Sequence, residues 1–81
     1  MGRRLAVFSE AETQVSKQVG RRIEEARKER DIDSKTLAHQ VGISPATLCY
    51  YESGRSCCPV PVLVKISHRL SVPLVDLLPQ N

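Results

Sequence analysis

Three cysteines and two histidines are the residues of this chain best suited to metal binding or nucleophilic chemistry. Cys57 and Cys58 are adjacent, which is not a usual zinc spacing, so Cys49, His39 and His68 would join them only in an unusual geometry. No nucleophile paired with a base, no phosphate-binding loop and no carboxylate dyad is visible. An odd number of cysteines also argues against a disulfide framework. We therefore expect free thiols, no metal, no cofactor and no enzymatic activity.

Residues 34–53 place small and apolar side chains where two short crossing helices need them. Ala38 lies on the inner face of the first helix and is small enough for a second helix to pass close by. Gly42 ends that first helix, because glycine adopts the left-handed conformation of a helix C′ position at little cost. The Ser-Pro pair at 44–45 supplies a favoured N-cap and a favoured first helical residue. The segment therefore predicts a helix-turn-helix motif.

The second helix of this motif would turn one face inward, through Leu48 and Tyr51, and the opposite face toward the major groove of double-stranded DNA. Neither Pro45 nor Ala46 can hydrogen-bond a base edge, although Ala46 would fit against a thymine methyl group. The outward face has no positive charge, so we expect weak direct readout, with specificity resting on thymine methyl groups, DNA shape and dimer spacing. The candidate base contacts are Ser44, Pro45, Ala46, Thr47, Cys49 and Tyr50.

Length and charge limit the kind of protein this is. The chain has 81 residues and a formal net charge of +3. All of the excess positive charge falls in residues 1–30, which hold eight Lys or Arg against five Glu, whereas residues 31–81 hold four of each sign. Such a balance favours an anionic partner. The length predicts one small domain, which dimerisation would help to stabilise.

Residues 1–8 lack the long apolar run of a signal peptide, and no other run is long enough to span a membrane. Gly2 would suit myristoylation, but Ala6 stands where that signal requires Ser or Thr. We therefore expect a cytoplasmic protein with no membrane contact, and no small-molecule ligand is evident.

The spacing of apolar residues predicts an all-α domain of five helices. An apolar stripe runs from Ala11 through Val15 to Ala26, with Ser9 and Glu12 as a possible capping box. Since Gly20 interrupts the stripe, we expect the regular part of this helix to begin near Ser16. The further helices are expected at 34–41, with Asp33 as N-cap, at 45–53, from about Pro61 to Leu70, and as one last turn at 74–78. The domain would span 9–78, between an N-terminal arm at 1–8 and a tail at 79–81.

The segments VGRRIEEARKERDIDSKTLAHQVGISPATLCYYESGR and LVKISHRLSVPLVDLL resemble the Cro/repressor-type (Xre-type) helix-turn-helix domain family across about residues 19–78. The resemblance implies a five-helix, lambda-repressor-like domain that binds operator DNA as a homodimer and represses or activates transcription. The family positions that match are Ile23, Arg27, Leu37, Ala38, Gly42, Ile43, Leu48, Glu52, Gly54, Leu63, Leu70 and Leu74.

Some roles of family residues carry over to this chain. Arg27 and Glu52 match a partly buried ion pair that ties the first helix to the end of the second helix of the motif. Arg55 matches a basic residue that contacts DNA phosphate. Ser34 replaces the usual phosphate-binding glutamine, so the contact would come from its hydroxyl, from helix N-terminal N–H groups or from the neighbouring Lys35.

Two further surfaces are candidates for contacts with DNA or with a second copy of the chain. Arg3 and Arg4 would lie along the DNA backbone or minor groove, whereas Leu5 to Phe8 would instead pair as a strand across a dimer, and a frayed terminus is the third possibility. The C-terminal segment holds more apolar residues than one short turn can bury. The proposed dimer contacts are Val72, Leu74, Val75, Leu77 and Leu78.

Two classes of function are therefore compatible with the sequence. The first is a sequence-specific transcriptional regulator of the kind found as phage repressors, restriction–modification controllers or antitoxin-like autoregulators. The alternative is a protein-interaction module that keeps the helix-turn-helix fold without binding DNA, which the uncharged outward face favours.

Overall fold

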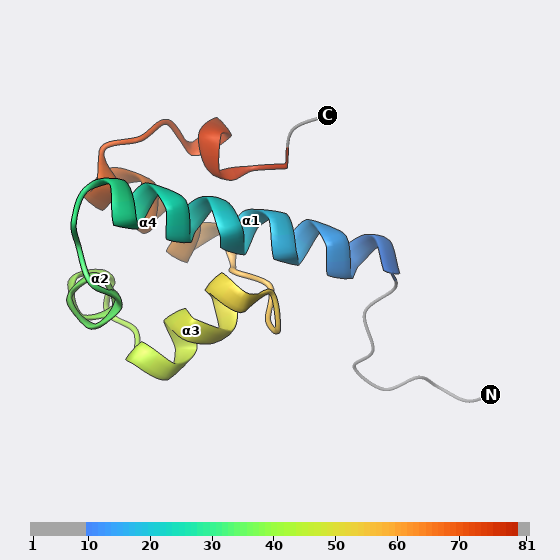
Figure 1. Ribbon diagram of the computed structural model, residues 1–81, viewed down its shortest axis with the longest axis horizontal. Helices are drawn as coiled ribbons and strands as arrows, with labels where there is room; N and C mark the ends of the chain where they lie inside the picture. The colour runs from blue at the N-terminus through green and yellow to red at the C-terminus, as the bar shows by residue number, and fades with distance from the viewer. Residues whose placement is uncertain (1–9, 80–81) are drawn as a thin grey trace.

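The computed structural model describes residues 10–79, and these form four α-helices and one 3-10 helix, with no strand among them (Figure 1). The elements are α1 (Glu10–Glu29), α2 (Ser34–Val41), α3 (Pro45–Ser53), α4 (Val60–Leu70) and the 3-10 helix η1 (Leu74–Leu77). The expected all-α class is confirmed for this part of the chain. The count of five α-helices is not, because the fifth element is η1.

The shortness of η1 follows from the prolines on either side of it. Pro73 fixes its start, and Leu78, which precedes Pro79, is extended with φ −93° and ψ 158°. A residue before proline disfavours the α conformation, because its backbone clashes with the proline ring. Four residues between these limits complete one 3-10 turn and no more.

The helices pack around one apolar core, with α1 running across the middle of the view in Figure 1, between the C-terminal segment with η1 above it and α3 below it. Helix α1 packs chiefly on α3, α2 packs on α3 and α4, and η1 packs on α1 and α4. Every element except η1 and α3 contributes several buried side chains, and those two contribute one each. The largest fully buried side chains are Ile23, Leu37, Leu48, Ile66, Leu70 and Leu77.

Helix α1 is longer than the sequence pattern indicated. It is continuous from Glu10, so the expectation that its regular part begins near Ser16 is wrong. Its first turns extend past the end of α3 (Figure 1), and Val15 is accordingly 47% exposed. The apolar stripe is buried only from Val19 onward.

Gly20 does not interrupt α1 but marks the place where it crosses α3. A Cβ atom at this position would overlap the backbone carbonyl oxygens of Tyr51 and Glu52, at the C-terminal end of α3. Only glycine allows the two backbones to approach so closely. Helix α1 continues past Gly20, because the glycine is required by the close approach of α3 and does not end the helix.

The caps of the helix-turn-helix motif are those that the sequence predicts. The Asp33 carboxylate accepts a hydrogen bond from the Thr36 N–H at 2.8 Å, and Gly42 follows α2 in the left-handed conformation, with φ 80°. The Ser44 hydroxyl accepts from the Thr47 N–H at 3.1 Å. Gly54, with φ 83°, ends α3. Helices α2 and α3 therefore have the expected bounds, whereas α4 begins at Val60, one residue before the expected start.

The proposed arm at residues 1–8, with Arg3 and Arg4, lies outside the described residues, as does Ser9 of the possible capping box. Within residues 10–79, no helix combines the length and the apolar character needed to cross a bilayer.

Candidate nucleic-acid interface

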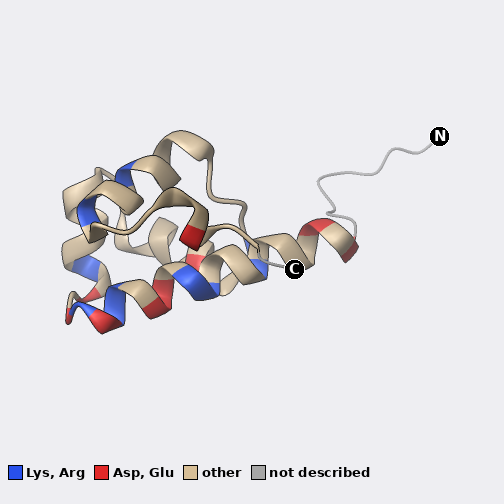
Figure 2. Ribbon diagram, turned by 90° about the horizontal axis from the view of Figure 1, so that it is seen from above, with Lys and Arg blue, Asp and Glu red and all other residues tan. Residues whose placement is uncertain are grey.

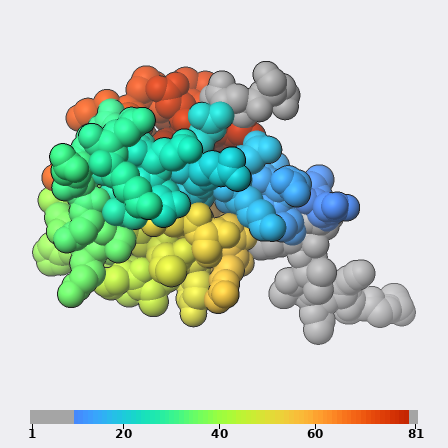
Figure 3. All heavy atoms as spheres, viewed as in Figure 1, coloured from blue at the N-terminus to red at the C-terminus, as the bar shows by residue number. Residues whose placement is uncertain are grey.

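Helix α3 rests on α1 and α2 with one face and leaves the other at the molecular surface (Figure 3). Leu48 anchors it with a fully buried side chain, and Tyr51 is half-buried on the same side. Tyr50 points the other way and is 47% exposed. The predicted assignment of the two tyrosines to opposite faces therefore agrees with their burial.

The outward face of α3 is formed by residues that recur at helical spacing. Ala46, Cys49 and Tyr50 are exposed, as is Pro45 at the N-terminal end, while Thr47 is half-buried. Ser53 is also exposed and lies seven residues after Ala46, so it belongs to this face, although it is not among the predicted base contacts. Its position could have been found from the helical period alone.

Hydroxyl groups at both ends of this face are bonded within the helix. The Ser44 Oγ caps the helix through the Thr47 N–H and lies 2.8 Å from the Thr47 Oγ1. The Ser53 hydroxyl donates to the Tyr50 carbonyl oxygen at 3.2 Å. The free polar group with the longest reach on this face is therefore the Tyr50 phenol.

The charged residue of α3, Glu52, is paired with Arg27 of α1. The Arg27 Nε and Nη2 donate to the two Glu52 carboxylate oxygens at 2.8 and 3.2 Å, and each side chain is only 10% exposed. The Arg27 Nη1 also donates to the Ile32 carbonyl oxygen at 2.8 Å. The hydrogen bond to Glu52, opposed by partial burial and aided by the carboxylate charge, raises the pKa of Arg27. This fork joins the end of α1 to the C-terminal end of α3.

Cationic residues flank α3 without lying on its outward face. Arg55 is exposed one residue after Gly54, and Lys35 is exposed in the first turn of α2, next to half-buried Ser34. Lys17 of α1 lies against Gly54, close enough that its side chain would meet a Cβ at that position. This contact joins residues far apart in the chain, so no local signal in the sequence could reveal it.

Charges of both signs alternate along α1 (Figure 2). The Lys28 Nζ lies 3.0 Å from the Glu24 Oε2 in an exposed ion pair. The Arg30 Nη1, just after the helix, lies 3.5 Å from the Glu29 Oε1. Two of the five Lys and Arg residues of α1, Arg27 and Lys28, are therefore held in ion pairs with carboxylates. Arg55 and Lys17 lie beside the C-terminal end of α3, where they are well placed to meet an anionic partner.

The N-cap of α2, Asp33, carries a negative charge. The hydrogen bonds that the Asp33 carboxylate accepts from Thr36, with the backbone N–H contributing most, lower its pKa. The group is therefore ionised at neutral pH and satisfies an N–H group at the start of α2.

The three cysteine thiols have different surroundings. Cys49 is exposed on α3, and the Cys57 thiol lies 2.9 Å from the buried Ser16 hydroxyl of α1. Burial, with a smaller effect of Cys57, raises the pKa of Cys58 to about 11. No group of three or more His, Cys, Asp or Glu suited to hold a metal ion occurs in residues 10–79.

The proposed dimer contacts divide according to burial. Leu77 is 1% exposed and belongs to the core of the chain itself, and Val72 and Leu74 are half-buried against that core. Val75 and Leu78 are 58% and 36% exposed. Only the last two offer a large apolar surface for a second copy to cover.

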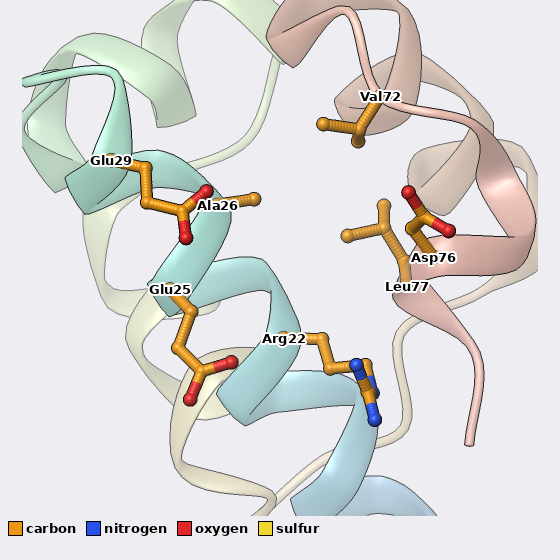
Figure 4. A pocket seen from close by; sticks show the side chains of 7 residues that line it. All are labelled: Arg22, Glu25, Ala26, Glu29, Val72, Asp76 and Leu77. Atoms are coloured by element: carbon orange, nitrogen blue, oxygen red, sulfur yellow. The ribbon is translucent and has the colours of Figure 1, made fainter. Parts of the chain in front are cut away.

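Beside this segment lies a hollow of about 190 Å³ between α1 and the chain from Val72 to Leu77 (Figure 4). Apolar side chains form part of its wall, and charged side chains of both signs surround them. The lining residues are Arg22, Glu25, Ala26, Glu29, Val72, Asp76 and Leu77.

Comparison with known proteins supports the same architecture. The family model described as helix-turn-helix, HTH_3, matches residues 23–77. No curated protein sequence gives a significant match.

Several solved structures are similar in fold. The clp gene regulator ClgR from Corynebacterium glutamicum is 22% identical, with a TM-score of 0.75, over 76% of this chain and 66% of its own. The restriction-modification controller protein C.AhdI from Aeromonas hydrophila is 21% identical, with a TM-score of 0.72, over 75% of this chain and 92% of its own. Hydroxypropylphosphonic acid epoxidase from S. wedmorenis is 24% identical, with a TM-score of 0.76, over 83% of this chain.

The matched region is only part of two of these proteins. This chain spans just under two thirds of the ClgR chain, and 36% of the epoxidase chain. At such low identity, these similarities show the fold alone.

Proposed function

The chain belongs to the helix-turn-helix (HTH_3) family, and from this membership we propose that it is a sequence-specific DNA-binding transcriptional regulator. The observation that carries the proposal is the exposed outward face of α3, held by a fully capped motif and flanked by cations. A capped helix presented in this way fits the width of the major groove. Two of the similar structures are described as a gene regulator and a restriction-modification controller protein, which supports the proposal.

In this proposal the flanking groups hold the phosphate backbone and α3 contacts the bases. Arg55, Lys35 and the N-terminal turn of α2 at Ser34 are the phosphate contacts, and Arg3 and Arg4 are further ones. Phosphate contacts fix the position of the protein without carrying sequence information. The base contacts come from Pro45, Ala46, Thr47, Cys49, Tyr50 and the start of α3 at Ser44.

We also propose that the regulator acts as a homodimer. Val75 and Leu78 leave apolar surface exposed near the end of the domain, and burying it against a second copy is favourable. A two-fold dimer would place two α3 helices about 34 Å apart, one turn of DNA. Half-buried Val72 and Leu74 would form the edge of this contact.

A mobility-shift titration against random duplex DNA at two salt concentrations tests the proposal. A protein that binds phosphates loses affinity steeply as salt rises. Arg55→Ala should weaken binding to all sequences and reduce the salt slope by about one. Tyr50→Ala should reduce the preference for a selected operator by roughly 1–3 kcal/mol without lowering the melting temperature. Tyr51→Ala is the matched control, because the loss of this half-buried side chain should destabilise the fold instead.

The alternative is a protein-interaction module, and the lack of charge on the outward face of α3 favours it. Such a module would show little DNA binding at either salt concentration.

Sedimentation equilibrium at tens of micromolar tests the dimer separately. The dimer should sediment at twice the 9.0 kDa of one chain. Val75→Glu should give a monomer, while Val60→Glu, at a valine of α4 that is 65% exposed against 58% for Val75, should not.

A further inference from the structure

The outward face of α3 is mostly apolar, whereas a helix that contacts bases in the major groove commonly carries hydrogen-bonding side chains on this face. Pro45, Ala46 and Cys49 are exposed and offer ring, methyl and thiol surface, and Tyr50 adds an aromatic ring that is 47% exposed. Glu52 is the one charged residue in the sequence of α3, and its carboxylate is turned away into the ion pair with Arg27. The face is therefore electrically neutral.

The three hydroxyl groups of Ser44, Thr47 and Ser53 at the ends of this face are each hydrogen-bonded within the chain. The Ser44 and Thr47 hydroxyls bond one another while capping the helix, and the Ser53 hydroxyl bonds the Tyr50 carbonyl oxygen. These bonds use part of the hydrogen-bonding capacity of the three hydroxyls, so fewer of their donors and acceptors are available to a base edge.

The major groove offers few features that such a surface can distinguish. Guanine, adenine and unmodified cytosine present hydrogen-bond donors and acceptors there, and an apolar side chain leaves them unpaired. A methyl group at the C5 position of a pyrimidine is the one apolar feature in the groove. Thymine has this group, and 5-methylcytosine presents the same group in the same place.

We infer that α3 recognises the C5-methyl groups of pyrimidines, through Ala46 and the ring of Tyr50. This inference rests on the proposed DNA-binding function and names the feature of the DNA that is bound. Affinity comes from the cations beside α3, above all Arg55, while discrimination comes from methyl groups buried against the neutral face. The Tyr50 phenol at the tip of the ring is left to contact the DNA backbone.

The test begins with duplexes selected from a randomised pool by the full chain. At each selected thymine, replacement by uracil removes only the C5-methyl group and keeps the base pair. Burying one carbon corresponds to about fourfold in affinity, so each contacted thymine should lose about that factor. A duplex with 5-methylcytosine should likewise bind about fourfold more tightly than its unmethylated counterpart at the same position.

The outcomes separate this inference from the function it rests on. If affinity changes on replacing thymine by uracil but not on methylating cytosine, the contact is with the methyl group of thymine. If both substitutions change affinity by the same factor, α3 recognises the C5-methyl group on either base. If DNA binding depends on salt but its affinity changes with neither base substitution, the inference is overturned and the DNA-binding function stands. The absence of salt-dependent DNA binding overturns both.

Variants of α3 connect the effect to particular side chains. Tyr50→Phe keeps the ring and should preserve the ratio of thymine to uracil affinity, whereas Tyr50→Ala should bring that ratio close to one. Ala46→Gln places a hydrogen-bonding amide on the face and should shift the selected sequences toward adenine. A thermal melt of each variant confirms that it is folded. If Tyr50→Phe loses the ratio as completely as Tyr50→Ala, the phenol makes the contact and the inference is wrong.

Discussion

The ion pair between Arg27 and Glu52 gives the sharpest prediction about what holds α3 in place. Both side chains are only 10% exposed, and two hydrogen bonds join them in a fork. We consider four variants: Glu52→Gln, which removes the negative charge but keeps an acceptor, the single changes Arg27→Met and Glu52→Leu, and the double variant that combines these last two.

The expected size follows from the geometry. Two unit charges about 4 Å apart attract by about 4 kcal/mol at an effective dielectric constant of about 20. Partial burial opposes this attraction by removing both groups from water. Arg27→Met leaves a buried carboxylate without its partner and should cost about 3 kcal/mol, whereas Glu52→Gln should cost about 2 kcal/mol because one acceptor remains. The double variant leaves no buried charge and should cost about 1 kcal/mol.

Urea unfolding followed by circular dichroism measures these differences. In a domain of this size, 3 kcal/mol corresponds to a fall in melting temperature of about 12–24 °C. The double-mutant cycle of Arg27→Met and Glu52→Leu should give a coupling energy well above about 1 kcal/mol, because each of these single changes leaves the other charged group buried without its partner. If the double variant costs the sum of the single changes, the two side chains do not depend on one another and the reasoning fails.

Three further predictions concern a helix crossing, a cap and a thiol. Gly20→Ala should destabilise the domain by about 1–3 kcal/mol in urea unfolding despite the better helix propensity of alanine, because its methyl group overlaps α3 backbone, and a stabilised variant would contradict this. Because folding lowers the pKa of Asp33, the ionised carboxylate stabilises the domain at pH values above its ordinary pKa of 3.8, and this stabilisation is lost as the pH falls through the pKa of the folded state. The difference in melting temperature between the wild type and Asp33→Asn should therefore shrink in acid. A difference that stays constant with pH would refute this prediction. Cys58, with a pKa of about 11, should be alkylated far more slowly at neutral pH than exposed Cys49 in a mass-spectrometric time course, and equal rates would show that it is not buried as described.

The helix-turn-helix motif could be predicted because its signals are local. Asp33 and Ser44 cap helices through N–H groups three residues away, and Gly42 and Gly54 end helices by their own backbone conformation. Each of these interactions is complete within one turn, so residue type and spacing suffice to find it.

The features that sequence reasoning missed depend on contacts between distant segments. Gly20 looked like an interruption of α1 because a glycine inside a helix usually weakens it, and only the position of the α3 backbone shows why glycine is needed there. Likewise, Val15 fits the apolar stripe of α1, but its burial depends on whether α3 reaches that far. Leu77 presents the reverse case, since the core of the chain covers a side chain that the composition alone left for a partner.

The outward face of α3 lies between these two cases. The helical period predicts which side chains point outward, and their burial agrees with it. The period does not show which of the polar ones are free, because that depends on the bonds between Ser44 and Thr47 and between Ser53 and the Tyr50 carbonyl. Counting hydroxyl groups in the sequence therefore overestimates the capacity of this face to bind base edges. With those groups partly engaged within the helix, the remaining surface is apolar apart from the Tyr50 phenol, and methyl groups are the feature of the major groove that its apolar part can bind at no cost in unpaired polar groups.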